Sequence, residues 1–404
     1  MSDQTHEQFR EEVRAFLVEH APKWKAQIGI AECDAPTSEQ VQSWQRYLHE
    51  LGWGVPTWPV EYGGRALGMI ESLIWNREKS NAGVGYIHDF VGVGLAGPTI
   101  IARGTPEQKE RYLTKIASGE EHWCQLFSEP GAGSDMGALA TRADRVDDAW
   151  VINGQKVWSS GAMESDRGLL IARYDPSLPK QKGLVFLLLD MHAPGVEVRP
   201  LKQIDGGAHF AEVFFNDVVV PDSERVGEPG EGWSVAMTVL LHERSSIGGG
   251  AGSFTMPFDD VVKLARERGK DRDPLVRQAL AEIYSRKTIL DVLNARVQSA
   301  LLSGRIPEAE GSVIKLLMAQ LGSVTATNAI ELLGAAGTLA PGGAGASPAD
   351  RWQGSPQQRF LGMAALHIGG GTDEVQRNAI AERVLGLPRE PRPDKDVPFS
   401  ETRR

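Results

Sequence analysis

Two short stretches, Ser128–Asp135 (SEPGAGSD) and Gly154–Gly161 (GQKVWSSG), indicate the fold and chemistry of this chain more than any other part of its sequence. The first is a tight turn rich in main-chain amides, which can hold an anion or the polar edge of a cofactor. The second supplies Trp158 and small hydroxyl groups that can cover and bond a flat ring system. We interpret the pair as a flavin site, although Gly, Pro, Ser and Asp also make ordinary turns.

Six further segments occur in the order found in the acyl-CoA dehydrogenase family, and the chain resembles that family over nearly its whole length. They are Trp53–Gly64 (WGVPTWPVEYGG), Thr105–Lys109 (TPEQK), Phe214–Pro221 (FFNDVVVP), Gly230–Trp233 (GEGW), His242–Arg244 (HER) and Gly369–Arg377 (GGGTDEVQR). The resemblance implies FAD as cofactor, an acyl-CoA thioester as substrate, and an electron-transferring flavoprotein or similar acceptor as partner. The implied reaction removes an α-proton and a β-hydride to give the trans-2-enoyl thioester.

The composition is that of an ordinary globular protein large enough for two or three domains, with 404 residues, 41% hydrophobic and 24% charged. A net charge of −10 gives no general attraction to nucleic acid or to anionic membranes. Two cysteines, Cys33 and Cys124, are too few for a disulfide framework. The N-terminus is polar, and no stretch approaches the roughly 20 apolar residues of a membrane span. We therefore expect a cytoplasmic protein without stable membrane insertion.

Hydrophobic spacing predicts an α+β protein of several domains. Phe9, Val13, Phe16 and Leu17 recur at the spacing of an amphipathic helix. From about residue 122 the pattern changes to short strands, and Asn153-Gly154 between two of them predicts a tight hairpin. We expect an N-terminal helical domain (1–121), a middle β-barrel domain (122–232), a C-terminal helical bundle (233–388) and a tail (389–404) that is mobile or draped on a neighbour. This is also the domain order of the resembled family.

The ends of one helix are marked clearly. Thr105 and Gln108 predict a capping box, Pro106 takes the first helical position, and Gly119 ends the helix. Further strands are predicted at Leu169–Tyr174, Leu184–Leu189, Val196–Val198 and Glu212–Val220, and further helices at Val261–Arg268, Pro274–Ser303, Ile314–Leu333 and Asp373–Leu385. The Gly- and Ala-rich stretch Pro341–Gly354 predicts a loop.

The resemblance assigns the cofactor contacts. It places Trp158 against the flavin and Ser160 on its polar edge, while the isoalloxazine side or the mouth where CoA enters is lined by Gln125, Phe127, Ser128 and Ser134. Thr372 follows three glycines and is a good N-cap for the last helix. Because this turn meets FAD in the family, Thr372 and Glu374 are also expected to contact the cofactor.

The catalytic base is predicted at an unusual place. Most family members have a Glu two residues before the Thr of the last-helix turn, but here Gly370 offers the thioester carbonyl only its main-chain amide. In the isovaleryl-CoA and long-chain branches the base is the Glu of a Glu-Arg pair on an earlier helix, which is Glu243-Arg244 here. We expect Glu243 to be the general base, with its pKa raised by burial, and Arg244 to position the helix or steer the substrate. The alternative is that Glu243 forms a structural ion pair.

Two family features on the adenine side of FAD are missing. The Arg-x-x-Phe-Gly element that reaches the neighbouring subunit's FAD has no clear match within Leu264–Leu280, and Glu331 stands where a Gln is usual. A carboxylate near a pyrophosphate is unfavourable unless it is turned away or paired. The contact across subunits is therefore made differently or is weaker.

Three functions stay open on the sequence. The favoured one is a catalytic acyl-CoA dehydrogenase; the others are an oxygen-using flavoenzyme on the same fold and a non-catalytic subunit of a heteromeric dehydrogenase. A homodimer or homotetramer is expected, with a heterotetramer as the alternative. No metal is predicted, and neither His88 nor His367 has a sequence partner at metal or triad spacing.

Overall fold

The computed structural model of the protein describes residues 3–29, 36–86, 88–248, 256–303, 310–339 and 355–402. The chain divides into two compact units. The first unit contains Met1–Leu201, Phe210–His242 and Pro393–Arg404, and the second contains Lys202–His209 and Glu243–Arg392. The expected loop at 341–354 lies outside the described residues.

The first unit begins with helices packed around a tryptophan-rich core. The helices are α1 (Asp3–Ile28), α2 (Ser38–Glu50), α3 (Met69–Asn81), α4 (Gly97–Arg103) and α5 (Pro106–Ser118). Val13 and Leu17 are buried with four tryptophans, and Phe9 and Phe16 pack against them, so the predicted apolar face of α1 is confirmed. The predicted ends of α5 are also confirmed: Thr105 and Gln108 form the capping box, and Gly119 closes the helix in the left-handed conformation.

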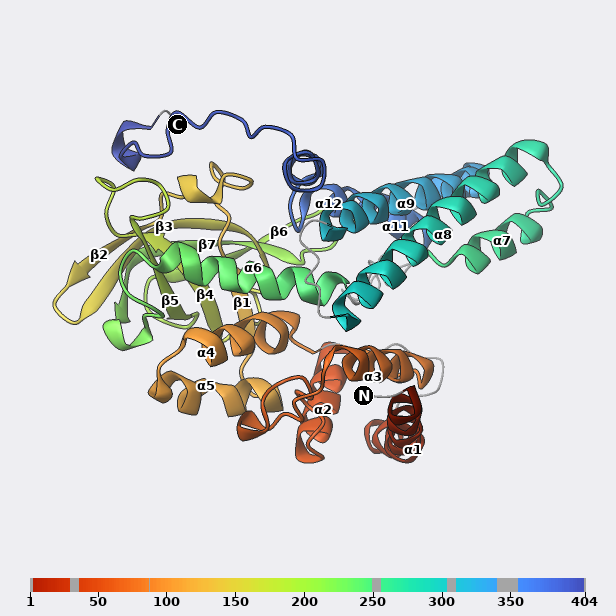
Figure 1. Cartoon of the computed structure of the whole chain (residues 1–404), viewed down its shortest axis with the longest axis horizontal. Coiled ribbons are helices and arrows are strands. Elements are labelled where there is room, and N and C mark those ends of the chain that lie inside the picture. The colour runs from red at the N-terminus through yellow and green to blue at the C-terminus, as the bar shows by residue number, and fades with distance from the viewer. Residues whose placement is uncertain are drawn as a thin grey trace. The chain divides into compact units, whose positions relative to one another are not determined.

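A seven-stranded sheet follows, formed by β1 (Trp123–Leu126), β2 (Arg142–Val146), β3 (Ala149–Ser160), β4 (Arg167–Arg173), β5 (Leu184–Asp190), β6 (Val196–Leu201) and β7 (Phe210–Pro221). The strand order is β1-β4-β2-β3-β7-β6, with β5 paired to β4. The middle domain is thus a curled sheet (Figure 1). The four predicted strands outside the expected hairpin are confirmed as parts of β4, β5, β6 and β7.

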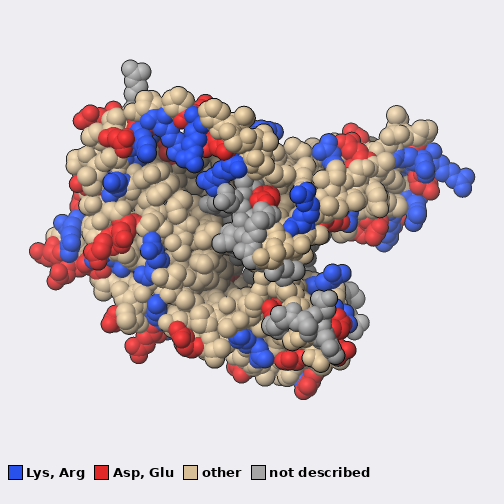
Figure 2. Space-filling view, in the orientation of Figure 1, with Lys and Arg blue, Asp and Glu red and all other residues tan. Residues whose placement is uncertain are grey.

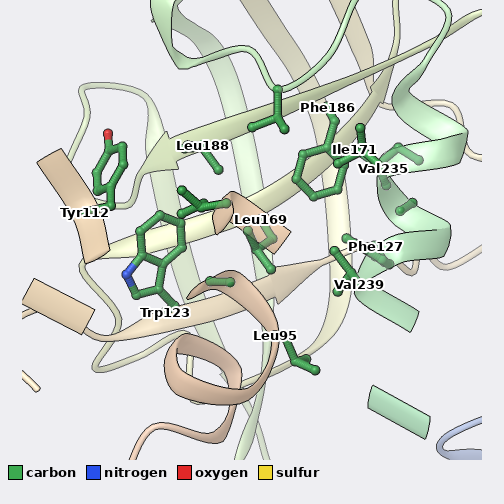
Figure 3. Close-up of a cluster of buried hydrophobic side chains, with 14 of the residues drawn as sticks. Leu95, Tyr112, Trp123, Phe127, Leu169, Ile171, Phe186, Leu188, Val235 and Val239 are labelled. Atoms are coloured by element: carbon green, nitrogen blue, oxygen red, sulfur yellow. The ribbon is translucent and has the colours of Figure 1, made fainter. Parts of the chain in front are cut away.

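Both faces of the central strands are buried, because two hydrophobic clusters lie on opposite sides of the sheet. Leu169 and Ile171 of β4 belong to one cluster, while the alternating Leu170 and Ala172 belong to the other. The first cluster also includes Val235 and Val239 from the beginning of α6 (Gly232–Gly248). Figure 3 shows these valines beside Phe127, Ile171 and Phe186. This packing fixes the first part of α6 on the sheet.

The predicted hairpin at Asn153-Gly154 is wrong. Strand β3 runs straight through both residues, and the register with β7 shifts between Ile152 and Gly154. Across the ladder, Asp217 has a φ of 50° and exchanges hydrogen bonds with the Asn153 side chain. Glycine is needed at 154, because a Cβ there would lie 2.7 Å from Thr141 Oγ1. The Asn-Gly pair therefore serves a β-bulge, in which one strand contributes an extra residue.

The final residues of the first unit are held on the sheet domain, which corrects the prediction that all of 389–404 is mobile. Phe399 is 2% exposed and lies under the Arg173 guanidinium, whose carbon is 3.6 Å from the ring centre. The amides of Phe399 and Ser400 donate to the carbonyls of Leu178 and Pro176. A charged, proline-rich composition does not reveal such docking, because one aromatic residue and a few main-chain bonds are sufficient for it.

The second unit is helical. Its elements are the end of α6, α7 (Phe258–Glu267), α8 (Pro274–Leu302), α9 (Glu310–Leu333), α11 (Pro356–Gly362), α12 (Ala364–Ile368) and α13 (Asp373–Ala379), followed by a π-helical turn at Ile380–Val384. The predicted helices are confirmed, although the last one is divided between α13 and the π-turn. Helix α9 packs against α7, α8, α11, α12 and α13 and supplies Ile314, Met318 and Leu321 to the core.

Helix α9 contradicts the prediction that no stretch of the chain approaches the length of a membrane span. The stretch Glu310–Thr338 is long and apolar enough to cross a membrane by length and composition, and half of its most apolar window is buried in the structure. The core helix of a globular unit meets the same criteria. The surrounding helices of the second unit account for this apolar character.

Candidate active site

The loop Ser128–Asp135 is anchored at its beginning by a buried ion pair. Lys156 Nζ lies 2.9 Å from Glu129 Oε1 and 3.0 Å from the Phe127 carbonyl oxygen. Glu129 also accepts hydrogen bonds from the amides of Ala140 and Thr141. Burial alone would raise the pKa of Glu129, but Lys156 and these hydrogen bonds outweigh it and hold that pKa below its ordinary value. The loop therefore starts from a fixed point in the sheet.

Trp158 stands out from β3 in a strained conformation. Its φ is +61°, in the left-handed region that bulky residues rarely adopt, and the ladder with β7 shifts register between Lys156 and Ser159. The neighbouring Val157 amide donates to the Ser128 carbonyl, which joins the bulge to the loop. The indole is 61% exposed and meets Phe210 edge to face at 5.9 Å. Such strain is typical of functional positions.

The tip of the loop is open and rich in free donors. Within the described part of the chain, the amides of Gly131, Gly133 and Ser134 donate no hydrogen bond. A Cβ added at either glycine would meet nothing within 4 Å. Beside the bulge, the fully buried Ser159 Oγ has no hydrogen-bond partner among the described residues. An exposed indole, unpaired amides and hydroxyl groups are a donor set that fits the flat ring and polar edge of FAD.

The other predicted residues of this region differ in accessibility. Ser134 and Ser160 are exposed, and Gln125 and Ser128 are half-buried. Phe127 is 4% exposed, and its ring packs edge to face on Phe186 within the first hydrophobic cluster (Figure 3). Phe127 would thus meet a cofactor through its main chain, because its ring belongs to the core.

In the second unit, the glycine turn before α13 is fixed through its carbonyl oxygens. Lys315 Nζ donates to the Gly371 carbonyl at 2.6 Å, and Gln376 Nε2 donates to that of Gly370 at 2.8 Å. Thr372 caps α13 by accepting the Val375 amide, which confirms the predicted N-cap. Glu374 points into solvent, with its side chain 76% exposed and paired with Arg377.

His367 does have partners at triad distances, contrary to the sequence analysis. Its Nε2 lies 2.6 Å from Ser323 Oγ, and its Nδ1 lies 2.7 Å from Asp373 Oδ2. Asp373 is 8% exposed and also lies 3.6 Å from Lys315. Ser323, His367 and Asp373 come from α9, α12 and the first turn of α13, so their spacing in the sequence gave no sign of contact.

His88 also has a partner that sequence spacing missed. Its Nε2 lies 2.9 Å from His122 Nε2, at the meeting of the first helices with the sheet. Burial, together with the neighbouring His122, lowers the pKa of His88 to about 4. Neither the His88–His122 contact nor the contact of His367 with Ser323 and Asp373 involves a predicted cofactor residue. The described residues contain no group of three or more His, Cys, Asp or Glu that could hold a metal.

The predicted base lies in the last turns of α6. Glu243 is half-buried and falls four and eight residues after the fully buried Val239 and Val235, so it continues their face of the helix. Preceding it, His242 has a pKa lowered by burial, and its Nε2 lacks a hydrogen-bond partner among the described residues. The side chain of Arg244 lies outside the description.

The region of the missing adenine-side element has its own local structure. Between α7 and α8, a groove of about 320 Å³ is lined partly by Phe258, Arg266 and Tyr284. Glu331 is exposed at the end of α9, and Lys270 Nζ donates to its carbonyl oxygen at 3.5 Å. A lysine at the C-terminus of a helix is electrostatically favourable. Lys270 thus brings a positive charge next to Glu331, which stands where a Gln is usual.

Comparison with known proteins agrees with this architecture. Residues 3–120, 124–218 and 230–385 match the N-terminal, middle and C-terminal domains of acyl-CoA dehydrogenases. Acyl-CoA dehydrogenase IpdE1 of Mycobacterium tuberculosis is 38% identical over 392 residues, which cover 95% of this chain and 98% of the relative. These matches involve all three domains.

Two solved structures are also similar over nearly the full length. The Tcur3481-Tcur3483 steroid acyl-CoA dehydrogenase has 31% identity and a TM-score of 0.79, with 96% of this chain and 99% of that chain covered. The ChsE4-ChsE5 complex of Mycobacterium tuberculosis has 28% identity and a TM-score of 0.74, with the same shares covered. By sequence and by fold, the chain belongs to the acyl-CoA dehydrogenase family, whose enzymes use FAD.

Proposed function

We propose that this protein catalyses the FAD-dependent α,β-dehydrogenation of an acyl-CoA thioester, with Glu243 as the general base. The observation that carries the proposal is that the glycine turn before α13 offers amides but no free carboxylate. Gly370 has no side chain, Asp373 is engaged by His367 and Lys315, and Glu374 is exposed and paired. Proton removal therefore requires a carboxylate from another element.

Glu243 is the candidate because of its position on α6. Val235 and Val239 fix that face of the helix against the hydrophobic cluster that contains Phe127. Glu243 is half-buried on the same face and brings the carboxylate that proton removal requires. The adjacent His242 has its pKa lowered by burial and adds no positive charge.

The remaining roles follow from the first unit and the glycine turn. FAD, when bound, accepts the hydride from the β-carbon. We propose that Trp158 covers the ring, that Ser160 and the amides of the Ser128–Ser134 loop bond its polar edge, and that Thr372 contributes at the α13 turn. Gln125, Ser128 and the Phe127 main chain line the same side. The Gly370 amide would polarise the thioester carbonyl and make the α-proton more acidic.

Anaerobic titration with a panel of acyl-CoAs tests this proposal, with loss of the oxidised flavin band as the readout. We expect bleaching by one class of thioester in the wild type and a loss of at least 100-fold in the reduction rate for Glu243→Gln, the size typical of removing a general base. Glu120→Gln, which changes a carboxylate that is 64% exposed and has no assigned role, is the matched control and keeps the wild-type rate. Full activity of Glu243→Gln with bound FAD would rule out the assigned base.

We further propose that the acyl group is bulky and steroid-derived, because a solved relative with 31% identity is a steroid acyl-CoA dehydrogenase. The panel should therefore contain steroid-side-chain thioesters as well as straight chains. A similar solved structure is a complex of two proteins, which supports a heteromeric assembly with a second dehydrogenase-like chain. Native mass spectrometry of the protein alone will show whether it forms FAD-loaded homo-oligomers, which would remove the need for such a partner.

A further inference from the structure

Residues 393–402 form a C-terminal strap that lies on the sheet domain of the first unit (Figure 1, dark blue). The strap follows the connection between β4 and β5: the Phe399 amide donates to Leu178, the Ser400 amide donates to Pro176, and Pro398 bridges to Pro179. The same connection also contacts Asp135, at the end of the candidate cofactor loop, through Lys180. Two side chains of the connection region reach both neighbours.

Arg173 makes the first link. Its guanidinium carbon lies 3.6 Å from the centre of the Phe399 ring, while its Nη2 donates to the Gly137 carbonyl at 2.7 Å and its Nε donates to that of Leu139 at 3.0 Å. Both side chains are buried, with Arg173 3% and Phe399 2% exposed. A cation on an aromatic face is stabilised more strongly when water is excluded. Phe399 therefore holds the guanidinium in the orientation that binds the 137–139 turn.

Lys180 makes the second link. Its Nζ lies 2.5 Å from Asp394 Oδ2 of the strap and 3.0 Å from Asp135 Oδ2 at the end of the loop. The lysine side chain is 18% exposed, and Asp394 followed by Asp135 raises its pKa above the ordinary value. The same ammonium group thus joins two carboxylates that lie far apart in the sequence. This link shares no side chain with the first.

We propose that the strap positions the candidate cofactor and substrate loop Ser128–Asp135, with Phe399 and Asp394 acting through Arg173 and Lys180. The loop has two anchors. Glu129 and Lys156 hold its beginning, and the strap holds its end, so the exposed tip with Gly131, Gly133 and Ser134 lies between two fixed points. Ser134 is the residue that we place at the CoA mouth, so this inference rests on the proposed function where it concerns catalysis.

The proposal predicts a defined pattern of kinetic change. Without the second anchor the tip samples more conformations, and the substrate must order it on binding. For Phe399→Ala in the FAD-loaded enzyme we expect KM for acyl-CoA to rise roughly tenfold, which is smaller than the ~100-fold cost of misplacing reacting atoms. The rate of flavin reduction at saturating substrate should stay within about twofold, because the proposed roles place no strap residue at the reacting atoms.

Hydrogen–deuterium exchange of the FAD-loaded wild type, Phe399→Ala, Lys180→Met and Lys180→Arg tests the positioning directly. We expect faster exchange over 128–139 in Phe399→Ala and Lys180→Met, and wild-type exchange in Lys180→Arg, which keeps both ion pairs. Glu401→Gln removes an exposed charge of the strap outside both links and serves as the matched control. Unchanged exchange over 128–139 in Phe399→Ala, with faster exchange in the strap alone, would overturn the proposal.

The two proposals can fail separately. If no acyl-CoA reduces the wild-type flavin, the proposed function fails, while the exchange pattern still reports on the strap. Should Phe399→Ala not fold, Asp394→Asn breaks only the exposed link and gives the same test with a smaller effect. Loosening of the loop without any change in KM would show that the strap holds the loop but that the loop does not bind the substrate.

Discussion

Lys156 Nζ lies 2.9 Å from Glu129 Oε1, and the lysine is completely buried within the sheet domain. A buried cation with one carboxylate partner strongly destabilises the folded protein when that partner is lost. The pair joins the candidate cofactor loop to β3 and fixes the point from which that loop leaves the sheet.

Replacing Glu129 by Gln leaves the Lys156 charge buried without its counter-ion. We expect the free energy of unfolding to fall by about 3–5 kcal/mol, the cost typical of breaking a buried ion pair from one side. Glu120→Gln, which changes a carboxylate that is 64% exposed, should alter it by less than about 0.5 kcal/mol. Urea denaturation followed by circular dichroism measures both. A similar loss in the two variants would show that Glu129 has no special role.

The same ion pair makes the stability of the protein depend on pH. Because the pKa of Glu129 is lower in the folded protein than in the unfolded chain, its contribution to stability is present above the unfolded pKa and is lost as pH falls through the folded value. Wild type should therefore lose stability on acidification below about pH 4 more steeply than Glu129→Gln, which cannot titrate there. Equal slopes of unfolding free energy against pH would contradict this expectation.

His88 should add a second acid-sensitive step at higher pH. Its pKa is lowered from 6.5 to about 4, which corresponds to about 3 kcal/mol of stability that is present above pH 6.5 and lost as pH falls through 4. Asp89, whose pKa burial raises to about 6, changes stability in the opposite sense. The useful measurement is thus the difference in the free energy of unfolding between wild type and His88→Gln at each pH from 7 to 4. A difference independent of pH would exclude this role of His88.

Trp158→Gly should separate stability from cofactor binding. Glycine adopts a φ of +61° without the ~1–3 kcal/mol of strain that a bulky residue carries, so the apoprotein should lose little stability despite losing the contact with Phe210. FAD should dissociate about tenfold more readily, since ~1.4 kcal/mol of lost ring contact has that effect. Thermal unfolding of the apoprotein and FAD release by fluorescence give the two quantities. Unchanged FAD retention would exclude Trp158 from the flavin site.

The contact of Ser323, His367 and Asp373 should be structural. Ser323 lies inside the long helix α9, whose own main-chain amides are used within the helix and cannot form an oxyanion hole. We expect no labelling of Ser323 by a fluorophosphonate probe. Asp373→Asn should instead loosen the glycine turn, because it weakens the hold of Lys315 and His367, and should speed amide exchange over 369–372. Labelling of Ser323 that depends on His367 would point to a hydrolytic site.

Local signals predicted much of the fold. The capping box of Thr105 and Gln108 and the N-cap at Thr372 depend on neighbouring residues only, so their sequence patterns were sufficient. The apolar runs of β4 and β5 were also visible, since both strands are buried on both faces. Asn153-Gly154 misled because a hairpin turn and a β-bulge need the same residue types, and only the pairing partner Asp217 distinguishes them.

The site was harder to predict, because its residues act through contacts between distant segments. Glu129 and Lys156, which hold the loop, were quoted within the motifs but received no role, and the docking of Phe399 under Arg173 had no sequence signal. Phe127 was expected beside the flavin, but its ring is part of the core. The assignments of Glu243, Gly370 and Thr372 came from resemblance to a family and stay predictions.

Helix α9 has a consequence for how the protein is made. It has the length and hydrophobicity of a membrane-spanning segment, and it becomes covered only when helices that come before and after it in the chain have closed around it. During synthesis, α9 leaves the ribosome before α11, α12 and α13, so its apolar surface is exposed to water for a time. An apolar surface exposed at that stage makes the nascent chain prone to aggregation. We therefore expect correct folding to require that α9 stays protected until α11, α12 and α13 have been synthesised.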